Sequence, residues 1–107
     1  MNKKLPNYHE DLIHSLKNPK MRAAYLNEAI EDGDSRVLLL AFRNVAEAYG
    51  GMGKLSSKTK LARESLYRTL SGKGNPTLTT LQKIAREFGL KMSFEPEKTK
   101  VLASHHS

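Results

Sequence analysis

The sequence of 107 residues contains no cysteine. Disulfide bonds, thiolate metal ligands and cysteine nucleophiles are therefore excluded. No segment approaches the ~20 consecutive apolar residues of a membrane span. Lys3 and Lys4 are not followed by the apolar run of a signal peptide. From these absences we expect a soluble protein of the cytoplasm.

The sequence also lacks the residue patterns of an enzyme. His9, His14, His105 and His106 show no metal-ligand spacing with carboxylates, and the serines and threonines have no accompanying base. The adjacent histidines near the end lie in a polar tail, where only adventitious metal binding is expected. We therefore expect no catalysis, no metal and no cofactor.

The positive charge is distributed unevenly along a chain long enough for one domain. Residues 1–50 contain seven basic and seven acidic side chains, whereas residues 51–107 contain eleven basic and four acidic ones. The whole formal charge of +7 thus lies in the second half. Such a half attracts polyanions, because neutralising phosphates releases condensed counterions. Nucleic acid is its expected partner, and improved solubility is the alternative explanation.

Apolar residues recur at helical spacing through most of the chain, which predicts an all-α fold. Two helices are expected in the first third, the second of them capped by Asn18, started by Pro19 and ended by Gly33. A strongly apolar helix follows, capped by Asp34 or Ser35. We assign residues 1–33 to an N-terminal helical extension packed on the same domain, 34–95 to the DNA-binding core, and 96–107 to a flexible tail.

The stretch from Gly51 to Pro76 has the pattern of two short helices joined by a tight turn. Leucines supply the apolar contacts between the two helices, and most outward positions are basic. Six side chains can reach DNA phosphates: Lys54, Lys58, Lys60, Arg63, Arg68 and Lys73. Ser65 and Arg68 can also reach base edges. The pattern predicts a DNA-reading helix-turn-helix; the alternative is a helical hairpin with a solvated charged face.

The spacing of apolar residues changes from a helical to an alternating pattern after the last helix. Thr77 caps a helix whose inward face is expected to carry Leu78, Leu81, Ile84, Ala85 and Phe88. After Gly89, Leu90, Met92 and Phe94 alternate with polar residues, which predicts a short C-terminal strand. A lone strand leaves its backbone N–H and C=O groups unpaired. Its expected partner is a second copy of the chain or a strand of another protein.

Three pieces of the sequence are distinctive: YLNEAIEDGD at residues 25–34, RESLYRTLS at 63–71 and GNPTLTTL at 74–81. With them, residues 8–94 resemble the HigA-like addiction-module antidote (antitoxin) proteins, a branch of the Xre and Cro repressor-like helix-turn-helix superfamily. The resemblance implies a five-helix repressor-like fold and a dimer that binds a palindromic operator at its own promoter. It also implies direct neutralisation of a RelE- or ParE-like toxin encoded beside it.

The resemblance further implies roles for individual residues. Four positions fall on the groove-facing side of the second helix, namely Arg63, Glu64, Ser65 and Arg68, and Lys54, Lys58 and Lys73 fall near the DNA backbone. The residues themselves leave alternatives open: Arg63 can read a base or bind a phosphate, and Arg68 can read guanine, pair with Glu64, or do both. Tyr67 either packs against the final helix or hydrogen-bonds a phosphate.

Two positions depart from the family pattern. Many members have glycine in the turn and serine at the start of the second helix, where this chain has Lys60 and Ala62. Lys60 is strained if the turn needs a positive φ. Ala62 lacks the oxygen of an N-cap, which is commonly worth ~1 kcal/mol.

For the toxin, the expected contact is the acidic helix end formed by Glu28, Glu31 and Asp32, which suits a basic nuclease. Two other functions remain open from the sequence. One is a stand-alone, prophage-type transcriptional regulator with no toxin. The other is a protein-interaction module whose basic face meets an acidic protein rather than DNA.

Overall fold

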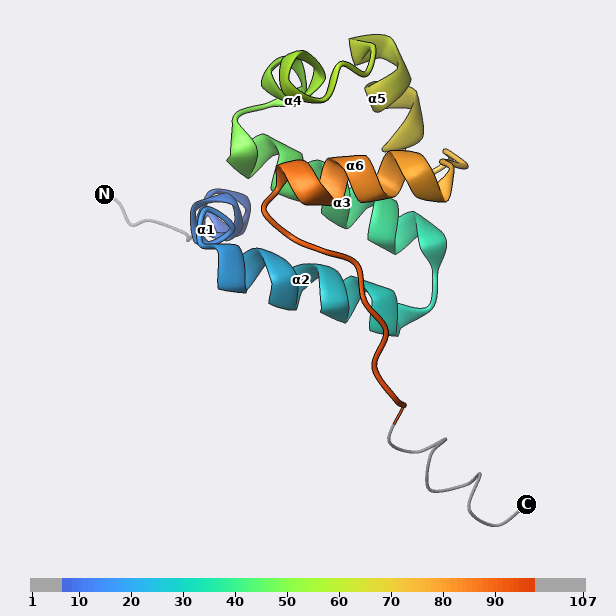
Figure 1. The fold of residues 1–107 in the computed structure, drawn as a ribbon. Coiled ribbons are helices and arrows are strands. Elements are labelled where there is room, and N and C mark those ends of the chain that lie inside the picture. The colour runs from blue at the N-terminus through green and yellow to red at the C-terminus, as the bar shows by residue number, and fades with distance from the viewer. Residues whose placement is uncertain (1–6, 98–107) are drawn as a thin grey trace, which may run out of the picture.

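The structure is a computed structural model that describes residues 7–97 as six α-helices (Figure 1). Their bounds are α1 Tyr8–Ser15, α2 Pro19–Asp32, α3 Ser35–Tyr49, α4 Met52–Thr59, α5 Arg63–Thr69 and α6 Leu78–Glu87. None of these helices is long and apolar enough to cross a membrane. The described range is thus all-helical, as predicted, although most of the tail expected over 96–107 lies outside it.

The helix ends are where the capping residues predict them. The Asn18 side chain accepts a hydrogen bond from the Lys20 amide at 2.8 Å, with Pro19 in the first turn of α2. The Asp34 carboxylate caps α3 by accepting from the Arg36 amide at 2.9 Å. Each such cap satisfies an amide without a helical partner and is worth ~1 kcal/mol. These local contacts determine at which residue each helix begins, independently of tertiary packing.

One hydrophobic core joins the helices, with α3 and α6 crossing at the centre of the molecule (Figure 1). Its most deeply buried side chains come from every helix from α3 to α6 and from the residue after α1: Leu16, Val45, Leu55, Leu66, Leu70, Ile84 and Phe88. Burying one such side chain contributes ~1.5–3 kcal/mol. The expectation for Leu78 is wrong, because it is 61% exposed. The first turn of α6 extends beyond the core, so its apolar stripe begins at Leu81.

Arg22 of α2 ties the N-terminal helices to the end of α6. Its guanidinium donates hydrogen bonds to the carbonyls of Leu16 and Lys17, after α1, at 2.8 and 3.1 Å. It also donates to the carbonyl of Phe88, after α6, at 2.8 Å. Carbonyls at helix C-termini lack intrahelical donors and carry partial negative charge. One cation therefore satisfies the ends of two helices that are far apart in sequence.

The C-terminal strand expected at Leu90, Met92 and Phe94 is not formed in this chain. Gly89 has a φ of 79°, and the Leu90 amide donates back to the Ala85 carbonyl at 2.9 Å, so Leu90 completes the cap of α6. Residues 91–97 then run across α2 without a hydrogen-bonded partner in the described chain (Figure 1). A strand is defined by pairing, and no second strand lies within residues 7–97 to supply it.

Tyr49, at the end of α3, makes the stability of the fold fall as the pH rises through the alkaline range. Burial raises the pKa of Tyr49 from its usual value of 10 to about 12, and the hydrogen bond that its hydroxyl donates to Glu87 at 2.5 Å adds to the shift. The folded chain holds the hydroxyl proton of Tyr49 more tightly than the unfolded chain does. This proton therefore adds to the free energy of unfolding below pH 10, and the added stability is lost as the pH rises toward 12. We expect Tyr49→Phe to flatten the decline of the urea midpoint over that range. Identical pH profiles for the two proteins would contradict this expectation.

Candidate nucleic-acid interface

Helices α4 and α5 are joined by a turn of residues 60–62 that side-chain hydroxyls hold in place. Ser56 Oγ donates to the Leu61 carbonyl at 2.6 Å. Thr59, buried at the end of α4, donates to the Leu55 carbonyl at 2.7 Å and accepts from the Leu61 amide at 3.3 Å. Since Leu55 and Leu66 are fully buried beneath the turn, the two helices form one rigid corner.

Both departures noted in the sequence have structural consequences. Lys60 has a φ of 67°, in the left-handed region that residues other than glycine rarely adopt. Ala62 occupies the N-cap of α5 and makes no side-chain capping hydrogen bond. Both predictions are confirmed. The turn is therefore held by its hydroxyl contacts in spite of two locally unfavourable residues.

Ala62→Ser is expected to stabilise the protein by ~1 kcal/mol, because the backbone there already has the extended conformation of an N-cap (φ −61°, ψ 137°). This corresponds to a rise of roughly 4–8 °C in Tm for a domain of this size, measurable by thermal unfolding. Ala62→Val is the control, since valine offers no oxygen to the α5 amides. A serine variant no more stable than the valine variant would show that the α5 amides are satisfied otherwise.

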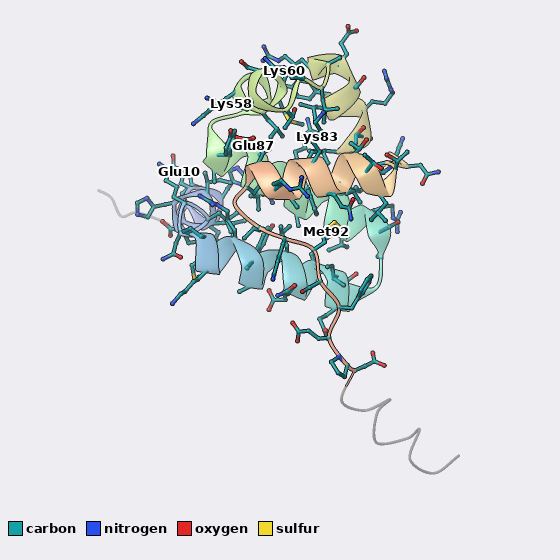
Figure 2. The ribbon with its side chains drawn as sticks, in the orientation of Figure 1. Glu10, Lys58, Lys60, Lys83, Glu87 and Met92 are labelled. Atoms are coloured by element: carbon teal, nitrogen blue, oxygen red, sulfur yellow. The ribbon has the colours of Figure 1, made fainter. Side chains whose placement is uncertain are left out.

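The outer face of this corner is strongly basic. Its basic side chains are all exposed: Lys54, Lys58, Lys60, Arg63, Arg68 and Lys73. Glu64 is the sole acidic residue between positions 51 and 76. Figure 2 shows Lys58 and Lys60 near α4, at the end of the molecule away from α2. The corner therefore presents a concentrated positive surface, although its contact with DNA stays a prediction.

Arg68 is oriented by Ser65 rather than by Glu64. Its guanidinium donates to Ser65 Oγ at 3.4 Å, a long and weak hydrogen bond. The ion pairs within residues 7–97 are elsewhere, at His9–Glu47 and Arg36–Asp34. The alternative in which Glu64 pairs with Arg68 is thus wrong for this chain, and Arg68 is left without a carboxylate partner in the described range.

Lys54 folds back toward α3 instead of extending outward. Its ammonium group lies 4.7 Å from the centroid of the Tyr49 ring, and its side chain runs along Gly50. A cation over an aromatic face at an exposed site gains ~0.5–1 kcal/mol. To reach a phosphate, Lys54 must leave this position, so we expect it to contribute less to DNA binding than Lys58.

Tyr67 has a neighbour that the sequence pattern did not indicate. Its ring centroid lies 5.5 Å from the guanidinium carbon of Arg43, on α3, and 5.9 Å from that of Arg63. The two alternatives for Tyr67, packing against α6 and hydrogen-bonding a phosphate, did not include this contact with α3. Arg43 lies 24 positions before Tyr67, and no motif linked the two residues. Only the tertiary arrangement of α3 and α5 brings them together.

The loop after α5 is held by hydrogen bonds of Ser71 and by close packing at Gly74. Ser71 Oγ donates to the Arg68 carbonyl at 2.9 Å and accepts from the Lys73 amide at 3.2 Å. A Cβ at Gly74 would lie 2.2 Å from the Thr69 carbonyl oxygen, so glycine is required there. Turn chemistry accounts for this loop, and Lys73 remains exposed beside the corner.

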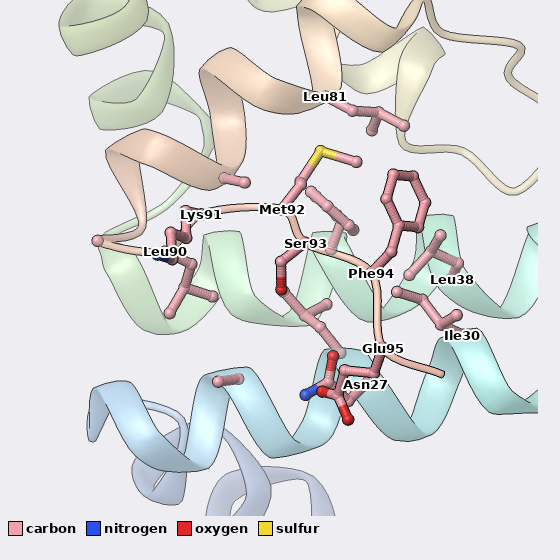
Figure 3. Close-up of a pocket in the computed structure, with 15 residues that line it drawn as sticks. Asn27, Ile30, Leu38, Leu81, Leu90, Lys91, Met92, Ser93, Phe94 and Glu95 are labelled. Atoms are coloured by element: carbon pink, nitrogen blue, oxygen red, sulfur yellow. The ribbon is translucent and has the colours of Figure 1, made fainter. Parts of the chain in front are cut away.

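A second surface lies where residues 90–95 cross the helices. They border a cavity of about 500 Å³ with an apolar lining from α2, α3 and α6. Figure 3 shows Met92 and Phe94 alongside Leu81 and Leu38 at this cavity. The Phe94 ring is fully exposed and Met92 is 45% exposed. This segment therefore presents apolar side chains to solvent next to unpaired backbone.

The three acidic residues at the end of α2 are exposed but do not form a single cluster. Glu28 and Asp32 border a shallow hollow of about 370 Å³ that includes Val37 and Leu40, both partly exposed and apolar. Glu31 does not line this hollow. Residues four positions apart lie on the same face of a helix, so Glu28 and Asp32 border one hollow while Glu31 points elsewhere on α2.

Comparison with known proteins identifies the family. A family model described as "Probable addiction module antidote protein" matches residues 7–96. An uncharacterized protein of Haemophilus influenzae is 28% identical over 88 residues, which cover 82% of this chain and 90% of that protein. No solved structure matches the chain. The match spans all six helices, so the chain belongs to the family of addiction module antidote proteins.

Proposed function

We propose that this chain is the antitoxin of a type II toxin–antitoxin module of the cytoplasm, without catalytic activity of its own. It binds operator DNA as a dimer, represses its own operon and neutralises a RelE- or ParE-like toxin by direct contact. The family match supports the antidote role. The observation that carries DNA binding is the basic outer face of the α4–α5 corner, which contains six exposed cations and one carboxylate.

The dimensions of α5 suit a recognition helix. An α-helix with its side chains is about 10–12 Å in diameter, which fits the major groove of B-DNA at about 12 Å wide, and α5 is a short helix of seven residues. Arg63, Glu64, Ser65 and Arg68 are the proposed base-reading residues. Lys54, Lys58, Lys60, Tyr67 and Lys73 flank them as proposed backbone contacts. In a dimer, two such helices enter successive major grooves about 34 Å apart on a palindromic operator.

The proposed dimer contact is the segment of residues 90–95, paired antiparallel with its own copy. A register centred on Ser93 places Lys91 opposite Glu95 and Met92 opposite Phe94. Both cross-strand pairs are then favourable, each by ~0.2–1 kcal/mol. The exposed apolar side chains and the unpaired backbone of this segment support the pairing.

The proposed toxin contact is the acidic end of α2, on the opposite side of the molecule from the α4–α5 corner (Figure 1). The hollow between Glu28 and Asp32 offers an apolar floor with two carboxylates at its rim. We expect the double variant Glu28→Ala/Asp32→Ala to weaken toxin binding at least tenfold, because a basic partner loses two charge contacts. Isothermal calorimetry with the purified toxin measures this. Glu31→Ala is the control outside the hollow, and a loss as large as that of the double variant would contradict the role of the hollow.

A growth assay tests the antitoxin proposal. The open reading frame adjacent to this gene is induced alone and together with this chain, and cell density is followed. Arrest by the neighbour and rescue by this chain is the expected result. Absence of arrest, or arrest without rescue, would favour a stand-alone transcriptional regulator. Failure to bind any duplex DNA would favour the protein-interaction module.

A further inference from the structure

Two arginines from different helices share one tyrosine ring at the edge of the basic corner. Arg43 of α3 and Arg63 of α5 have their guanidinium carbons 5.5 and 5.9 Å from the centroid of Tyr67. All three side chains are exposed, and the tyrosine is 41% exposed. Both guanidinium groups thus lie beside the same ring at the surface.

Neither arginine has a carboxylate partner within the described residues. Glu47 is one turn after Arg43 on α3, but its carboxylate contacts His9 at 3.0 Å. Two like charges beside one ring, with no carboxylate partner, repel each other, and the ring offsets this only by ~0.5–1 kcal/mol for each arginine. A bound anion would remove the repulsion. This charge imbalance distinguishes the cluster from a contact that merely packs α5 against α3.

We propose that Arg43, Tyr67 and Arg63 form a phosphate-binding site for the backbone of duplex DNA. The inference rests on the proposed DNA-binding function and extends its contact surface from the α4–α5 corner to α3. Guanidinium groups bind phosphate oxygens through paired N–H donors. Stacking on the ring restricts both side chains in advance, so less conformational entropy is lost on binding.

The same geometry assigns a role to Arg63. A Cβ at Gly53, in α4, would lie 3.4 Å from Nη1 of Arg63, so this guanidinium lies over the first turn of α4. Arg63 therefore reaches back toward α3 and α4. From this position it binds a phosphate instead of reading a base, which narrows the proposed base-reading set to Glu64, Ser65 and Arg68.

The test is the salt dependence of DNA binding by the full chain. The probes are a duplex from the promoter of its own gene and a scrambled duplex of equal length. Arg43→Ala is expected to weaken binding to both duplexes by the same factor, roughly 3- to 10-fold, and to make the log–log salt slope shallower by about 1. Arg36→Ala is the matched control, because it removes the same charge from the same helix. Its guanidinium is already paired with Asp34 at 2.8 Å, so we expect an unchanged slope.

Three results would overturn the inference. An unchanged salt slope with a lowered Tm for Arg43→Ala would show that the cluster only packs α5 against α3. A loss confined to the promoter duplex would show that Arg43 reads a base. Equal losses of DNA affinity for Arg43→Ala and Arg36→Ala would show that the effect comes from net charge alone. If the unaltered protein binds neither duplex, the proposed DNA-binding function itself fails, and that outcome is distinct from the other three.

Discussion

Arg68→Ala is expected to remove most of the discrimination at one base pair of the operator. A bidentate contact between arginine and guanine is worth ~1–3 kcal/mol of specificity, or roughly 5- to 150-fold. Arg68 is exposed on α5 and has no carboxylate that holds it back within the described residues. Binding is measured on the operator and on variants in which each base pair is changed in turn. The variant protein should no longer distinguish one of these positions.

Lys58→Ala is the control for Arg68→Ala. It removes an equal charge from the same basic face, but we expect it to weaken every sequence alike. Thermal unfolding of both variants should match that of the original protein, because both side chains are exposed. If Arg68→Ala also weakens every sequence by the same factor, Arg68 contacts the backbone and is not a base reader.

Phe94→Glu is expected to dissociate the dimer and to lower operator affinity by 100-fold or more. In the proposed pairing, Phe94 lies beside Met92 of the second copy, so the substitution places a charge in an apolar contact. A monomer engages one half-site and loses the avidity of two linked contacts, which amounts to a factor of 10²–10⁴. Sedimentation measures the association state, and titration of the operator duplex measures the affinity.

The exposure of Phe94 makes this prediction specific. Because the ring is fully exposed in the single chain, Phe94→Glu should leave the unfolding of the monomer unchanged. The register is tested with charges: Lys91→Glu places two glutamates opposite each other, and adding Glu95→Lys should restore the dimer. If Phe94→Glu remains dimeric, the subunits meet at another surface. If the original chain is monomeric but requires Phe94 to bind the toxin, residues 90–95 pair with the toxin instead.

The sequence predicted the helices well because their signals are local. Asn18 with Pro19, Asp34, and Thr77 each satisfy amides within three residues, so their spacing alone predicts where α2, α3 and α6 begin. For Lys60, strain was predicted on the condition that the turn needs a positive φ, and the structure gives it a φ of 67°. These features depend on contacts that the chain makes with itself over a few positions.

Features that depend on distant partners were predicted less well. The strand at Leu90–Phe94 was expected from alternation alone, but alternation does not supply a partner strand. The inward position of Leu78 was expected from helical period, but α6 extends past the core at that turn. The pairing of Glu64 with Arg68 was one alternative that their spacing offered, but no such ion pair forms within residues 7–97, where Arg68 contacts Ser65.

The sequence by itself determined the all-helical class, the helix boundaries, the location of the positive charge and the resemblance to antidote proteins. Each of these is encoded in residue type, short-range spacing or local composition. Only the tertiary structure brought Arg43 to Tyr67 and separated Glu31 from the hollow between Glu28 and Asp32. It also left Phe94 exposed beside an apolar cavity. Helix crossing and packing decide these juxtapositions, and no local pattern in the chain encodes them.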